Sequence, residues 1–215
     1  MGLTGKKVLI VDTHPLVLGL TKDLLQNNGF EVRAASSASE AQQIFNAFKP
    51  EVCVTDVELE PNATGVDLAN SLRLQNLNLH LVFLTSLPDF RPLGVPRESI
   101  PGRFAYLNRG LMTDPKRLIH AIEAGGNAKA LAAFRDDKLE HSELSSVSRI
   151  QLEVLRLVAL GFTNQEIADH RNVTLRAVEA LLNRAASALN IDGERGSNPR
   201  VKLARVFIRE AGLPL

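Results

Sequence analysis

The chain has 215 residues, of which 45% are hydrophobic and 23% are charged, and its formal net charge is +1. This composition excludes a chain that is disordered along its whole length, and the near-neutral charge lacks the basic excess that alone would indicate nucleic-acid binding. The length suits two domains. The single cysteine excludes an intrachain disulfide, and no segment has the pattern of a signal peptide or a membrane span, so we expect a cytoplasmic protein without membrane contact.

The first half of the chain predicts alternating strands and helices. Short apolar runs stop at polar residues, and the segments between them repeat apolar residues at helical spacing. This alternation predicts an α/β fold with a parallel sheet and right-handed crossovers. The expected strands span residues 7–11, 30–35, 52–56, 81–84 and 104–107, and the expected helices span 16–28, 40–48 and 67–73, with a further helix beginning near Pro115.

The segment from Leu87 to Arg103 is unusually rich in proline, with Pro88, Pro92, Pro96 and Pro101. Proline inside a helix costs about 3 kcal/mol or more, because it removes a hydrogen bond and its ring collides with the preceding turn. We therefore expect no regular helix between the fourth and fifth strands.

Polar residues stand at the carboxyl ends of four expected strands, namely Asp12, Asp56, Thr85 and Arg109. In open parallel sheets these ends meet at one edge, which is where ligands bind. An ionised Asp at the end of a buried strand is costly unless a cation or hydrogen-bond donors compensate it. Asp56 is therefore the candidate centre of a functional site.

Residues 6–125 resemble the receiver domain of two-component response regulators. The resemblance rests on four motifs in order, Val-Leu-Ile-Val-Asp-Thr-His-Pro (8–15), Val-Thr-Asp (54–56), Phe-Leu-Thr-Ser (83–86) and Ala-Tyr-Leu-Asn-Arg (105–109). It implies a flavodoxin-like, five-stranded parallel sheet of order 2-1-3-4-5. It also implies that Asp56 accepts a phosphoryl group from a histidine kinase, aided by Mg²⁺, Asp12, the backbone carbonyl of Glu58 and the hydroxyl of Thr85, with Tyr106 as the switch aromatic.

Two positions of the expected pocket depart from the family pattern. Thr13 stands where the family has a second acidic residue, so a carboxylate ligand is missing and Mg²⁺ becomes a weak, non-obligatory cofactor. Arg109 stands where the family has a lysine, and its planar guanidinium is bulkier than an ammonium. The side chain of Glu58 is a candidate replacement ligand, which gives Asp12, Asp56 and Glu58 as the expected metal ligands. A receiver that works without phosphorylation and a conventional phosphoacceptor at Asp56 both remain open.

The second half of the chain predicts a separate, all-α domain. We expect a receiver-like domain at residues 1–125, a helical linker at 126–143 and the second domain at 144–215, which is mildly basic with 10 Lys and Arg against 7 Asp and Glu. Apolar periodicity and cap residues predict helices at 149–160, 165–172, 175–189 and 200–211. The second and third of these, joined by a short turn, form a helix-turn-helix.

Residues 144–212 resemble the LuxR/NarL-type DNA-binding domain, on the motifs Leu-Glu-Val-Leu-Arg-Leu-Val-Ala-Leu-Gly-Phe-Thr-Asn-Gln-Glu-Ile-Ala (152–168) and Val-Thr-Leu-Arg-Ala-Val-Glu (173–179). The resemblance implies that helix 175–189 enters the DNA major groove and that the last helix pairs two subunits. Glu179 replaces a basic residue of the family, which predicts either weaker DNA binding or a contact to cytosine. The DNA-contact candidates are Thr174, Arg176, Ala177, Glu179, Ala180, Asn183 and Arg184; the dimerisation candidates are Leu203, Val206 and Phe207, for which core packing alone is the alternative.

Together the two resemblances imply a response-regulator transcription factor and not an enzyme. It would bind double-stranded DNA as a homodimer, with a histidine kinase or another regulatory protein as a further candidate partner. One alternative is a protein-interaction anti-activator whose recognition helix no longer binds DNA. Another is a hydrolase with Asp56 as nucleophile, but the sequence lacks the general acid and the lid that such chemistry needs.

Overall fold

The computed structural model describes residues 5–60, 63–93, 95, 97–125, 127–138, 143–191 and 198–211. The chain forms two compact units. The first, which we call the receiver unit, consists of Met1–Thr85 and Pro96–Asp137. The second, the helical unit, consists of Ser86–Val95 and Lys138–Leu215. Among the described residues, no helix combines the length and the apolar character that crossing a membrane requires.

The receiver unit is built on a five-stranded parallel sheet with the order β2-β1-β3-β6-β7. This order confirms the predicted flavodoxin-like α/β fold. The central strands are buried on both faces, as expected for a parallel sheet covered by helices. The strands are β1 (Lys7–Val11), β2 (Glu31–Ala35), β3 (Val52–Thr55), β6 (His80–Thr85) and β7 (Phe104–Asn108).

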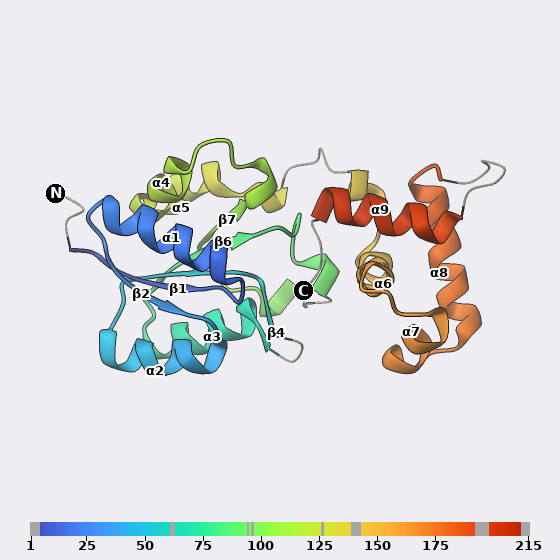
Figure 1. The fold of residues 1–215 in the computed structure, drawn as a ribbon, viewed down its shortest axis with the longest axis horizontal. Coiled ribbons are helices and arrows are strands. Elements are labelled where there is room, and N and C mark those ends of the chain that lie inside the picture. Colours follow the sequence, from blue (N-terminus) through green and yellow to red (C-terminus); the bar gives the residue numbers. More distant parts are fainter. Residues whose placement is uncertain are drawn as a thin grey trace. The chain divides into compact units, whose positions relative to one another are not determined.

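Helices cover both faces of the sheet, with α1 (Pro15–Asn27) and α4 (Lys116–Ala124) on one face and α2 (Ala38–Phe48) and α3 (Gly65–Gln75) on the other (Figure 1). Side chains cap the helices of the second pair. The hydroxyl of Ser37 accepts from the backbone N–H of Glu40, and Thr64 forms a reciprocal capping box with Asp67. These caps hold the loops that lead out of β2 and β3.

The proline-rich segment after β6 contains no α-helix in its described residues, as the sequence predicts. It forms only two short 3₁₀ turns, at Arg91–Leu93 and Arg97–Ser99. The loop after Asp56, between β3 and α3, forms a small antiparallel hairpin that the sequence did not predict. It consists of β4 (Glu58–Glu60) and β5 (Ala63–Thr64).

The expected helical linker is largely part of the receiver unit. Its helix, α5 (Ala128–Leu131), is only four residues long and is followed by 3₁₀ turns at Ala132–Phe134 and Asp136–Lys138. Leu131 is buried in the same hydrophobic core as Leu118 of α4. The described residues 128–137 therefore pack as a last element of the receiver unit.

The helical unit contains four helices whose bounds lie within one residue of those predicted from the sequence. Ser148 and Thr163 cap the first two through capping boxes, and the turn before the third passes through Asn172 in the left-handed conformation. The hydroxyl of Thr174 then caps the third helix by accepting from Ala177. The helices are α6 (Arg149–Ala159), α7 (Asn164–Arg171), α8 (Leu175–Ala188) and α9 (Pro199–Ala211).

The close approach of α3 to the loop after β3 gives a first prediction. A Cβ atom at Gly65 would lie 1.8 Å from the carbonyl oxygen of Asp56. Gly65→Ala should therefore lower the free energy of unfolding by about 1 to 3 kcal/mol, measured by urea denaturation. Gly19→Ala is the matched control, because that helical glycine has open space around it, and it should raise stability by up to about 1 kcal/mol. Equal effects of the two substitutions would contradict the steric argument.

Candidate functional site

Four predicted site residues gather at the carboxyl edge of the receiver sheet. Asp12 directly follows β1, Asp56 directly follows β3, Thr85 ends β6 and Arg109 directly follows β7. Asp12, Asp56 and Thr85 are 3%, 2% and 0% exposed. Two buried carboxyl groups at one edge need compensation by opposite charge or by hydrogen bonds.

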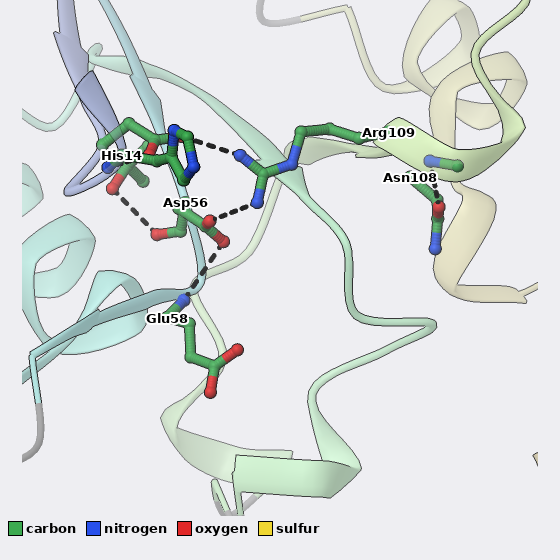
Figure 2. A network of polar contacts seen from close by, with 8 residues as sticks. His14, Asp56, Glu58, Asn108 and Arg109 are labelled. Atoms are coloured by element: carbon green, nitrogen blue, oxygen red, sulfur yellow. Dashed lines mark hydrogen bonds and ion pairs between the residues drawn. The ribbon is translucent and has the colours of Figure 1, made fainter. Parts of the chain in front are cut away.

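The guanidinium of Arg109 supplies that compensation by bridging the two carboxylates (Figure 2). Its Nη1 lies 2.8 Å from Oδ2 of Asp12, and its Nη2 lies 2.8 Å from Oδ2 of Asp56. The two nitrogens of the planar fork thus donate to two different acids, a geometry that a lysine ammonium does not reproduce. Removal of one partner from such a buried network costs roughly 3 to 5 kcal/mol.

Backbone donors occupy the remaining carboxylate oxygens. Oδ1 of Asp12 accepts from the backbone N–H of His14 at 2.7 Å, and Oδ1 of Asp56 accepts from the backbone N–H of Glu58 at 3.2 Å. All four oxygens of the acidic pair therefore already have a donor within the protein. The pair is held in one geometry by its own chain.

The position of Arg109 depends on residues outside the predicted site. The side chain of Asn108 accepts from the backbone N–H of Gly110 and shapes the turn that carries Arg109. The backbone N–H of Asn108 donates to the buried carboxylate of Asp136 at 2.9 Å, and the guanidinium of Arg117 donates twice to the same carboxylate at 2.7 Å. Sequence reasoning placed Asp136 in the linker and missed this role, because no local pattern marks a contact across twenty-eight residues.

The pKa of Asp12 is raised above its ordinary value, chiefly because burial disfavours the charged carboxylate. The neighbouring charge of Asp56 raises it further, while the hydrogen bond from His14 and the charge of Arg109 act in the opposite direction. One guanidinium pairs with two carboxylates. When Asp12, Asp56 and Arg109 are all ionised, the three groups together carry a net negative charge, which favours a raised pKa at Asp12.

The described residues do not fit the Mg²⁺ ion that the receiver resemblance implies. They contain no group of three or more acidic, histidine or cysteine side chains placed to hold a metal. Thr13 offers only a hydroxyl, which is buried and has no hydrogen-bond partner in the described part of the chain. The carboxylate of Glu58 points away from Asp56 (Figure 2), and the cation already beside Asp12 and Asp56 is Arg109. A divalent ion at this place would meet the repulsion of that guanidinium.

The remaining receiver residues lie in the sheet itself. Thr85 is fully buried and stands opposite Asn108 in the register of β6 and β7. Tyr106, the expected switch aromatic, is also fully buried, with its ring 6.3 Å from that of Phe83. In this structure Tyr106 is therefore a core residue of the receiver unit.

In the helical unit, the predicted DNA-contact residues share one face of α8. The opposite face packs into the unit through Val178, Leu182, Ala185 and Ala186. Ala177 is half-buried, and the other candidates are exposed, namely Thr174, Arg176, Glu179, Ala180, Asn183 and Arg184. Glu179 and Asn183 also line a depression of about 200 Å³ that Asn164 and Arg200 border from α7 and α9.

The three dimerisation candidates on α9 do not form one exposed surface. Leu203 and Phe207 are 2% and 0% exposed and belong to the core of the helical unit. Val206 is half-buried, and the exposed apolar residue of this helix is Val201. Leu203 and Phe207 therefore pack in the core of the helical unit, and a role of this helix in pairing two subunits stays a prediction.

Comparisons with known proteins agree with both halves of this description. Residues 8–90 match the response regulator receiver domain. The nitrate/nitrite response regulator protein NarP of Escherichia coli (strain K12) is 25% identical over 97% of this chain and 97% of its own length. The response regulator protein VraR of Staphylococcus saprophyticus is 25% identical over 86% of this chain and 90% of its own. The chain is a homologue of NarL/LuxR-type response regulators.

A solved structure supports this relationship at the level of the fold. RcsB from Salmonella enterica serovar Typhimurium, bound to a promoter in the presence of a phosphomimetic, has a TM-score of 0.60 with 18% identity, over 94% of this chain and 98% of that chain. The DNA-binding transcriptional activator EvgA of Escherichia coli (strain K12) is a further relative, 22% identical over 84% of this chain.

The raised pKa of Asp12 gives a second prediction. A carboxyl group whose pKa is raised by folding adds stability below its unfolded pKa, and this contribution is lost as the pH rises through the folded pKa. Replacement by Asp12→Asn removes this dependence. The difference in free energy of unfolding, wild type minus Asp12→Asn, should therefore decrease as the pH rises above the ordinary pKa of an aspartate, measured by urea denaturation at a series of pH values. A difference that is constant or grows with pH would contradict the assignment.

Proposed function

We propose that this response regulator is a DNA-binding transcriptional regulator that acts as a homodimer. The observation that carries the proposal is the exposed face of α8, which is the second helix of a helix-turn-helix and is free of contacts to the core of its unit on that face. Such helices enter the major groove with their N-terminal residues at base edges. The relatives NarP and EvgA and the fold of RcsB support the same reading of α8.

The face of α8 has the side chains that this role requires. Arg176 and Asn183 can reach base edges, since Arg pairs with guanine and Asn with adenine. Thr174 and Arg184 lie near the flanks of that face, where phosphate contacts position a recognition helix. Glu179 lies among these residues and adds a negative charge to the face, so we expect the DNA affinity to depend only weakly on salt concentration.

We further propose that the receiver unit works without phosphorylation of Asp56. Support comes from Arg109, which already forms an ion pair with each of the two acids of the pocket and stands as the cation beside Asp56. Phosphorylation would require this guanidinium to leave two buried carboxylates at a cost of several kcal/mol. A histidine kinase is then not needed for the regulator to adopt its working state, and no substrate turnover is part of the proposal.

The DNA-binding role predicts the effect of removing two charges from α8. Arg176→Ala combined with Arg184→Ala should weaken binding to target DNA at least about tenfold and should flatten its salt dependence, as measured by fluorescence anisotropy over a range of salt concentrations. The control is Lys22→Ala combined with Lys129→Ala, which removes two exposed positive charges from the receiver unit. Equal losses in the two variants, or no loss in either, would favour the anti-activator alternative.

The phosphorylation-independent receiver predicts the response to a phosphoryl mimic. Beryllofluoride with Mg²⁺ should change neither the DNA affinity nor the oligomeric state of the wild-type chain, measured by anisotropy and by light scattering. Arg109→Lys is the informative comparison, because it restores the compact charge that receivers carry and frees one carboxylate oxygen. A response of the wild type as large as that of Arg109→Lys would support the conventional phosphoacceptor instead.

A further inference from the structure

The amino edge of the receiver sheet holds a small depression that is separate from the acidic pocket. It is lined by Arg73, Leu77, Asn78, Leu79, His80 and Arg103. These residues come from the end of α3, from the segment that leads into β6 and from the position directly before β7. The acidic pocket lies at the other end of the strands, and the six residues of β6, at about 3.3 Å each, separate the two edges by roughly 17 Å.

The guanidinium of Arg73 is held in this depression by backbone carbonyls and not by an acid. Its Nη1 donates to the carbonyl of Gly102, and its Nη2 donates to the carbonyls of Leu79 and Arg103, each at 3.0 Å. The third nitrogen, Nε, is buried and has no hydrogen-bond partner among the described residues. A buried N–H without an acceptor is costly, and more so when the group is charged. Nε therefore needs an acceptor that the described part of the chain does not supply.

The depression also carries positive charge that no carboxylate balances. No acidic residue lines it, and the ion pairs of the described residues involve neither Arg73 nor Arg103. Burial lowers the pKa of Arg73 below its ordinary value, and the positive charge of Arg103 lowers it further. The two guanidinium groups thus repel each other, and an anion beside them would be stabilised by both.

His80 adds an acceptor to the lining and not a further charge. Nε2 of its imidazole lies 2.9 Å from the carbonyl oxygen of Ala121, so Nε2 carries the proton of the neutral ring. Its Nδ1 is buried and has no partner in the described ranges. Burial lowers the pKa of His80, and the charges of Lys6 and Arg73 act in the same direction, whereas the bond to Ala121 opposes them. The arginines are therefore the cations of the depression.

The volume of the depression limits the size of a ligand. It is about 80 Å³. A single water needs roughly 10 to 15 Å³, and pockets for drug-sized ligands begin near about 300 Å³. The depression therefore has room for one small ion and not for a nucleotide. Two guanidinium groups without an acid favour a divalent oxyanion over a single carboxylate, because their charges then balance and their planar forks match phosphate oxygens.

We propose that the receiver unit binds a small divalent oxyanion of the phosphate class at Arg73 and Arg103. An oxygen of the anion accepts from Nε of Arg73, and the charge of Arg103 stabilises the anion from the position directly before β7. The carbonyl bonds of Arg73 already hold its guanidinium in place, so binding requires little ordering of that side chain. The site goes beyond the proposed DNA-binding function, whose contacts belong to the helical unit.

Titration of the full-length chain with inorganic phosphate tests the site at the atom that defines it. The side-chain Nε–H signal of Arg73 is observed by NMR at constant ionic strength and is assigned by its loss in Arg73→Lys. It should shift in a saturable manner, with half-saturation at millimolar phosphate, because the anion replaces a missing acceptor. If no saturable shift occurred below about 0.1 M phosphate, where screening becomes strong, water alone would fill the depression and the proposal would be overturned.

A matched pair of substitutions tests the contribution of Arg103. Its backbone φ is 54°, a left-handed conformation that Asn tolerates, so Arg103→Asn removes the charge without adding strain. Phosphate affinity should fall about tenfold, and Arg103→Lys should recover most of the loss. The control is Lys49→Asn, because Lys49 is also exposed, has a φ of 52° and lies outside the depression. Equal losses in Arg103→Asn and Lys49→Asn would indicate unspecific attraction to a basic edge and would refute the site.

The source of the anion is distinguished by a comparison of probes at equal ionic strength. Phosphate and sulfate represent the free ion, glycerol phosphate represents a phosphate group on a larger molecule, and acetate represents a carboxylate. Tighter binding of phosphate or sulfate than of glycerol phosphate supports a free ion, and the reverse order supports a phosphate group carried by a larger ligand at the same site. Tighter binding of acetate than of every phosphate and sulfate probe would contradict the assignment to the phosphate class.

Discussion

The ion-pair bridge from Arg109 to Asp12 and Asp56 is the interaction on which the receiver edge depends. Two carboxylates at the ends of adjacent parallel strands repel each other in a buried setting, and one planar cation between them makes the arrangement stable. The protein thus supplies a positive charge at this edge from its own chain. These two ion pairs join the electrostatics of the pocket to the position of the loop after β7.

Asp136 also holds the loop after β7. Its buried carboxylate accepts hydrogen bonds from the backbone N–H of Asn108 and from both terminal nitrogens of Arg117. The pocket and the segment after α4 are therefore parts of one electrostatic network. On the other side of the pocket, β6 is followed directly by residues that belong to the helical unit, Ser86–Val95.

The sequence predicted the regular elements well and the connections between them poorly. Strands β1, β3 and β6 follow from β-branched apolar runs that stop at polar residues, and α6 to α9 follow from helical periodicity with Ser148 and Thr163 as caps. The absence of a helix after β6 follows from its prolines. Within the expected helical linker the structure forms the short α5, and composition gave no sign that Asp136 of the same segment would bond to Asn108.

The sequence by itself determined the α/β receiver order, the helix-turn-helix and the meeting of Asp12, Asp56 and Arg109 at one edge, since periodicity and strand direction are local properties that fix where side chains emerge. Only the tertiary structure decided that Arg109 bridges both acids, that Leu203 and Phe207 are core residues, and that Ser86–Val95 belongs to the helical unit. These outcomes depend on competition among distant partners for burial and charge. No local pattern encodes the result of that competition.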